Sequence, residues 1–130
     1  MGAESTSVTE LVTVDTPKKR VYLHFRGFMT NEQAVSLREA YRQAIRQVGP
    51  GYTAVSIFEE FMPGKEDVQA VIASMIQMAD EGGCRAAARV AQGSVFGQMQ
   101  LGRLQRQVQA AYPIHDCETV TEADTYLDGV

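Results

Sequence analysis

Residues 52–67 constrain the fold more than any other part of the chain. Residues 53–58, TAVSIF, are mostly apolar and predict a strand, and residues 59–64 are expected to form its exit loop. A helix is then expected to begin at Lys65, because the acids that follow it suit the positive end of a helix. A strand that leads through a short loop into a helix is the repeating unit of α/β proteins, so we expect this class of fold.

Strand and helix patterns also alternate on both sides of this segment. Residues 10–15 and 20–26 predict two strands joined by a turn, which are close enough to form an antiparallel hairpin. Thr30 and Gln33 form a predicted capping box, and the helix that follows should end at Gly49. The later predicted elements are a helix ending at Gly82-Gly83, a strand at 85–90, a third helix capped by Ser94, a strand at 113–117 and a last helix capped by Thr119 or Thr121.

These elements predict a mixed, mainly parallel sheet of about five strands with an N-terminal antiparallel hairpin. Alternation along each strand divides the strand residues into two faces. We expect the helices mainly on the first face, with the second face open, thinly covered or buried in a dimer. The predicted first face collects Val21, Leu23, Phe25, Val55, Ile57, Ala86, Ala88 and Val90. The predicted second face is half polar and collects Tyr22, His24, Arg26, Ala54, Ser56, Phe58, Arg85, Ala87 and Arg89.

Length and charge limit the classes of partner. A chain of 130 residues fits one domain, which we place at residues 10–130 after a frayed segment at 1–9. The formal net charge of -4 comes from scattered acids and bases, so nucleic acid is not expected as a partner. No apolar run approaches the roughly eighteen residues of a membrane span, so we expect a cytoplasmic protein without a membrane partner.

Three segments carry a resemblance to a known family. They are residues 21–30, VYLHFRGFMT, residues 52–61, and Ala88-Arg89-Val90 with a glycine shortly after. In these segments and in its order of elements, the chain resembles the STAS family of sulfate-transporter and anti-sigma-factor-antagonist domains. It is most similar to the small stand-alone bacterial relatives of unassigned function. The resemblance implies a STAS-like fold and a partner or ligand surface at the end of the central strand.

The family's phosphorylation switch is not expected in this chain. In the anti-sigma-factor antagonists, an Asp-Ser or Asp-Thr pair opens the helix after the central strand, and phosphorylation there controls partner binding. Here the region reads FMPGKE at residues 61–66, and no hydroxyl residue lies between Glu59 and Ile72. The resemblance therefore implies partner binding without this control.

The residues that most often carry chemistry do not form a recognisable catalytic or metal-binding pattern. His24 and His115 lack the ligand spacing of a metal site, and Cys84 and Cys117 fit reduced, buried thiols. His115 and Cys117 share a strand face, but a Cys-His nucleophile also requires a positioned third group. We therefore expect no metal, no cofactor and no catalytic residue, and we expect a protein that is not an enzyme.

The favoured function is a non-catalytic interaction or regulatory module. The predicted contact residues are Phe58, Glu59, Glu60, Phe61 and Met62. Aromatic, Met and Arg side chains are enriched at interfaces, so we expect a homodimer, or a contact with another protein, through Phe58, Phe61, Met62 and the half-polar face.

A small-ligand binder or cryptic enzyme that uses the polar sheet face is the alternative function. Its candidate residues are Tyr22, His24, Arg26, Ser56 and Arg89.

Overall fold

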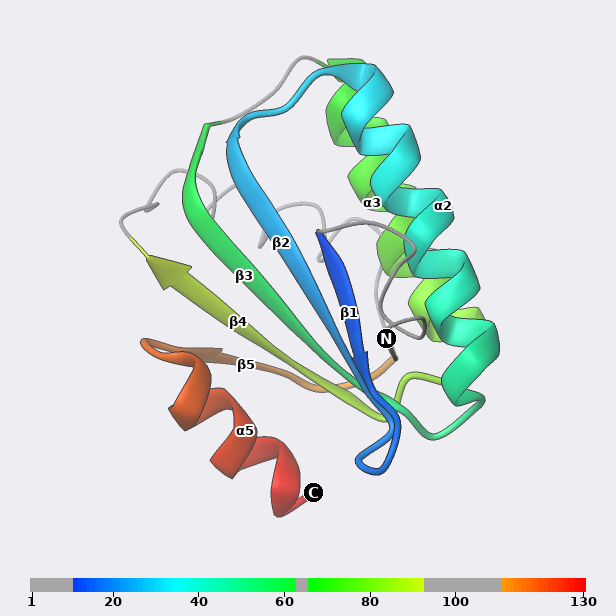
Figure 1. The fold of residues 1–130 in the computed structure, drawn as a ribbon, viewed down its shortest axis with the longest axis vertical. Helices are drawn as coiled ribbons and strands as arrows, with labels where there is room; N and C mark the ends of the chain where they lie inside the picture. Colours follow the sequence, from blue (N-terminus) through cyan, green and yellow to red (C-terminus); the bar gives the residue numbers. More distant parts are fainter. Residues whose placement is uncertain (1–10, 63–65, 93–110) are drawn as a thin grey trace, which may run out of the picture.

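The structure is a computed structural model that describes residues 11–62, 66–92 and 111–130 (Figure 1). The strands of these ranges are β1 (Val12–Asp15), β2 (Arg20–Phe28), β3 (Thr53–Met62), β4 (Ala86–Gln92) and β5 (Ile114–Cys117). The helices are α2 (Asn31–Val48), α3 (Glu66–Glu81) and α5 (Val120–Asp128). No helix within the described ranges is long and apolar enough to cross a membrane.

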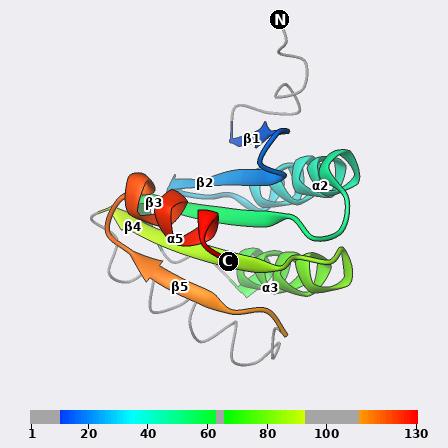
Figure 2. The same cartoon turned by 90° about the horizontal axis from the view of Figure 1, so that it is seen from below.

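The five strands form one sheet in the order β1-β2-β3-β4-β5. β1 pairs with β2 in the antiparallel direction, and the other neighbours are parallel, which confirms the predicted mixed sheet. The two crossovers β2-α2-β3 and β3-α3-β4 step in the same direction across the sheet. Because such crossovers are right-handed, they place α2 and α3 on one face, while α5 packs on the other (Figure 2).

The start and end of α2 and the start of α5 lie at residues that the sequence predicts as helix caps. The Thr30 Oγ accepts a bond from the Gln33 backbone N–H at 3.1 Å, and the Thr30 N–H donates to the Gln33 side chain at 2.9 Å. α2 ends at Gly49, whose positive φ of 79° suits glycine. The N-cap of α5 is Thr119, whose hydroxyl accepts a bond from the Glu122 N–H at 3.1 Å.

The predicted faces grouped the residues of β3 and β4 correctly with each other, but they were wrong by one residue in the phase of β2 relative to β3. The register places Leu23 beside Ser56, and Ser56 beside Arg89. Neighbouring residues in a ladder share a face, and alternation within one strand does not reveal its phase relative to the next. The α2/α3 face therefore collects Val21, Leu23, Phe25, Ala54, Ser56, Phe58, Ala87 and Arg89. The α5 face collects Tyr22, His24, Arg26, Val55, Ile57, Ala86, Ala88 and Val90.

Each face of the sheet carries a buried cluster. On the α2/α3 side, the rings of Phe25 and Phe58 stack with centroids 4.7 Å apart in the larger core cluster. On the other side, α5 contributes Ala123 and Leu127 to a smaller cluster that includes Val55. The α5 face is thus covered in part by one short helix. This agrees with the thin covering that was one of the three predicted possibilities.

The central strand is longer than predicted. Residues 59–62 continue β3 as far as Met62, so the first part of the expected exit loop is a strand. The ladder explains this extension, since Glu59 pairs with Arg26 and Met62 pairs with Phe28 after an irregularity in the register. The predicted frayed segment at 1–9 and the helix predicted after Ser94 lie outside the described residues.

Candidate functional site

The predicted interaction residues lie in the second half of β3. Phe58 is completely buried and stacks on Phe25, so its side chain belongs to the core and not to an exposed patch. Glu59 is partly exposed and pairs with Arg26 of the neighbouring strand. Glu60, Phe61 and Met62 occupy the last positions of β3, and their side chains lie outside the described part of the structure. The expected contact therefore cannot be centred on Phe58.

An exposed aromatic residue lies at the same end of the sheet, where β2 and β3 finish. Phe28 ends β2 as the ladder partner of Met62, and 59% of its surface is exposed. Gly27 precedes it with a positive φ of 52°, and Met29 after it returns to the core. This turn of the backbone leaves Phe28 outside while both of its flanking segments are anchored. The ring borders a hollow of about 200 Å³ lined by Phe28, Met29, Thr30, Asn31, Asp67 and Val68.

The five candidate ligand-binding residues do not share one face. Tyr22, His24 and Arg26 lie on the α5 face, as the register shows. Ser56 and Arg89 lie side by side on the α2/α3 face. They therefore cannot line one pocket on a polar face, as the alternative function requires.

The surroundings of Ser56 and Arg89 also bear on the alternative function. Ser56 borders a largely apolar cavity of about 40 Å³, far below the roughly 300–1,000 Å³ typical of ligand pockets. Arg89 donates from Nε to the Asp116 carboxylate at 2.7 Å. The geometry therefore favours packing and ion pairing at these positions over ligand binding.

His24, Arg26 and Glu59 form a small polar cluster in the second halves of β2 and β3. The Arg26 Nε donates to one carboxylate oxygen of Glu59, and the His24 Nδ1 lies 3.6 Å from the same oxygen. This bond from Arg26 lowers the pKa of the Glu59 carboxyl. A carboxylate held ionised by an arginine is a weak proton acceptor, which argues against Glu59 as a general base.

A second polar network ties α5 to the start of β2. The Arg20 guanidinium is almost fully buried and donates to Thr53 Oγ, Asp124 and Asp128, each at 2.9 Å. The Tyr22 hydroxyl donates to Asp124 at 2.7 Å. Burial, together with this bond, raises the pKa of Tyr22 to about 12. Because the buried guanidinium bonds two residues of α5, we interpret this network as a structural clamp for α5.

Cys84 is one of the two free, buried thiols, as predicted. Its sulfur donates to the Ala86 carbonyl at 3.4 Å, and burial raises the pKa of its thiol to about 12. A nucleophilic cysteine reacts as the thiolate, so this environment argues against catalysis by Cys84.

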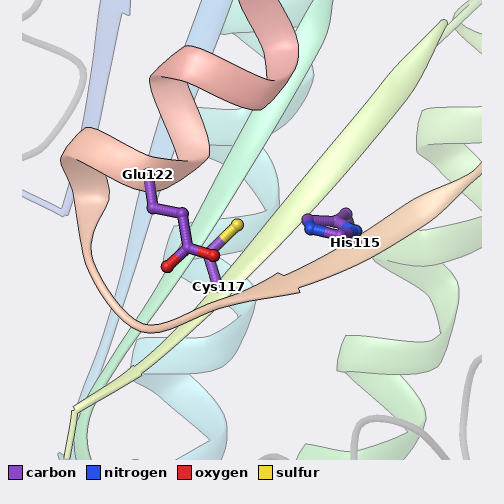
Figure 3. A group of neighbouring side chains, drawn as sticks. All are labelled: His115, Cys117 and Glu122. Atoms are coloured by element: carbon purple, nitrogen blue, oxygen red, sulfur yellow. The ribbon is translucent and has the colours of Figure 1, made fainter.

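The second thiol, Cys117, lies beside His115 as the sequence predicted, and the structure adds Glu122 to this pair. Donor atoms of His115, Cys117 and Glu122 all lie within 4.8 Å of one another where β5 passes into α5. Figure 3 draws the Cys117 sulfur between the His115 ring and the Glu122 carboxylate. Burial and the nearby acids Glu122 and Asp116 raise the pKa of the Cys117 thiol, which argues against a free Cys-His nucleophile. The nitrogen, sulfur and oxygen donors are, however, those that a zinc-type cation takes.

Sequence reasoning missed two features of these sites. Phe28 was passed over because it breaks the strand alternation, although an aromatic next to a glycine at a strand end was a usable signal. Glu122 was missed because the sequence pattern pairs His115 with Cys117 in one strand, whereas Glu122 lies in the first turn of the following helix.

Comparison of the chain with protein-family models, with curated proteins and with solved structures finds no significant match.

Proposed function

We propose that this protein is a non-catalytic, STAS-like interaction module of the cytoplasm that binds its partner at the carboxyl edge of β2 and β3. The observation that carries the proposal is Phe28, an aromatic side chain that is 59% exposed beside a hollow at this edge. Aromatic residues of this kind supply much of the binding energy at protein interfaces. The edge is also the one to which the family resemblance assigns a partner surface.

The chemistry of the described residues supports a role other than catalysis. The Cys84 thiol has a pKa of about 12, and Glu59 is held by Arg26. The segment between Glu59 and Ile72 contains no hydroxyl group, so phosphorylation at the start of α3 does not regulate the proposed contact.

The proposed partner is a second copy of the chain. Arg26 is exposed near Phe28, while Glu66 and Asp67 are exposed in the first turn of α3. A surface with both signs of charge can face a copy of itself, since a two-fold contact lets the basic group of each copy meet the acidic groups of the other. Two Phe28 rings would then be covered in one interface.

The contribution of Phe28 to association follows from the exposed area of its side chain. A phenylalanine side chain buries roughly 150–250 Å², so the exposed 59% of Phe28 offers on the order of 100 Å². Covering this area contributes about 2.5 kcal/mol for each copy. Its loss weakens association by roughly 50-fold or more.

Light scattering across micromolar concentrations tests this proposal on the wild type and on Phe28→Glu. We expect a dimer that the substitution converts to monomer at the same concentration. Val35→Glu is the matched control, because Val35 is 38% exposed on α2 and is not among the residues that line the hollow. A wild type that is monomeric throughout would refute the homodimer, and a dimer that survives Phe28→Glu would refute this edge as its interface.

A further inference from the structure

We infer that His115, Cys117 and Glu122 form a binding site for one zinc-type divalent cation. Their donor atoms lie within 4.8 Å of one another in the described part of the structure. Imidazole nitrogen, thiolate sulfur and carboxylate oxygen are the three donor types of zinc sites, where the bonds measure about 2.0–2.3 Å. Donor atoms this close to one another can converge on a single ion when their side chains rotate.

The ligands come from one short segment that the fold holds in place. His115 and Cys117 are two apart in β5 and so share a face, and Glu122 lies in the first turn of α5. The Thr119 cap fixes the start of α5, because its hydroxyl binds the Glu122 N–H. The site is thus built at the junction between a strand and the helix that follows it.

Each ligand also has a contact that orients it. The His115 ring stacks on Tyr126 with centroids 4.3 Å apart and an angle of 17° between planes. One Glu122 carboxylate oxygen accepts a bond from the Glu118 N–H at 3.0 Å, which leaves its other oxygen available. The Cys117 side chain is buried in the apolar cluster beneath α5. Contacts of this kind orient ligands and tune affinity in metal sites.

Three protein ligands leave the fourth tetrahedral position to water or to a group from a partner. Binding releases the Cys117 proton, since the thiolate is the metal ligand. The bound ion would also join β5 to α5, and it therefore stabilises the folded chain by an amount that rises with the logarithm of its concentration.

The test is titration of the reduced, chelator-treated full chain with Zn²⁺ and with Co²⁺. We expect one ion per chain, a thiolate-to-cobalt charge-transfer band and a higher melting temperature with Zn²⁺. Cys117→Ser should abolish the band. His115→Phe keeps a ring to stack on Tyr126 but removes both nitrogens, and it should weaken binding by at least the roughly 10- to 100-fold that loss of an outer-shell partner costs.

Two further variants keep the inference falsifiable if a change at the buried Cys117 impairs folding. Glu122→Gln alters an exposed side chain and should weaken binding while circular dichroism remains that of the wild type. Cys84→Ser changes the other buried thiol, which is not part of the cluster, and should leave the band unchanged. A wild type without the band, a band that survives Cys117→Ser, a band lost in Cys84→Ser, or binding unaffected by Glu122→Gln would each overturn the site.

Discussion

Replacing Arg20 with Met tests whether the buried guanidinium clamps α5 onto the sheet. Methionine keeps an unbranched apolar side chain but removes the charge and every donor. The side chain of Arg20 is only 3% exposed, and it bonds Thr53, Asp124 and Asp128. The substitution therefore removes three bonds in one step without adding a polar group.

The expected decrease in the free energy of unfolding depends on how well water can hydrate each former partner of Arg20. Thr53 is completely buried, so its hydroxyl loses a buried partner, at a cost of about 1–3 kcal/mol. Asp124 is 29% exposed and regains water in part, so its share is smaller than the roughly 3–5 kcal/mol seen for fully buried pairs. The desolvation of the guanidinium is recovered and offsets some of the loss. We expect a net decrease of about 2–4 kcal/mol in the free energy of unfolding.

Urea unfolding followed by far-ultraviolet circular dichroism measures this change. Lys18→Met is the matched control, because Lys18 also pairs with Asp128, at 3.5 Å, but both side chains are largely exposed. Such surface pairs contribute little, so the control should unfold almost as the wild type does. If Arg20→Met were no more destabilised than Lys18→Met, the clamp would be refuted. A double-mutant cycle with Asp124→Asn should also show non-additive losses, since the two residues share a bond.

Two further predictions concern pH and helix capping. The raised pKa of Tyr22, about 12 against an ordinary 10, means that the fold favours the neutral hydroxyl. The stability it contributes is complete below pH 10 and is lost as the pH rises from about 10 to about 12, so urea unfolding should show a flatter decline over this window for Tyr22→Phe than for the wild type. Thr30→Ala removes the acceptor for the Gln33 N–H and should lower the free energy of unfolding by about 1 kcal/mol, and an unchanged urea midpoint would contradict the capping role.

The candidate sites show why part of the prediction failed. Sequence patterns placed Phe58 at a strand end, but the extension of β3 and its pairing with β2 bury it against Phe25. Among the described side chains, an exposed ring at these strand ends is that of Phe28, whose position depends on a register irregularity between the two strands. Such exposure depends on the pairing of β2 with β3, whose paired residues lie more than thirty positions apart in the chain. The local periodicity of one strand does not predict this pairing.

The sequence by itself determined the features that depend on a few neighbouring residues. Capping at Thr30, the end of α2 at Gly49 and the alternation of β2 follow from backbone geometry within one or two turns, and they were predicted correctly. The cap of α5 is Thr119, one of the two threonines that the sequence offered. The tertiary structure decided the phase of each strand relative to its neighbour, and through it which side chains share a face. It also decided contacts such as Arg20 with Asp124, which are 104 residues apart and meet only because α5 packs across β3 and β4. Such contacts depend on the packing of complete elements against each other, and that packing is a property of the whole fold.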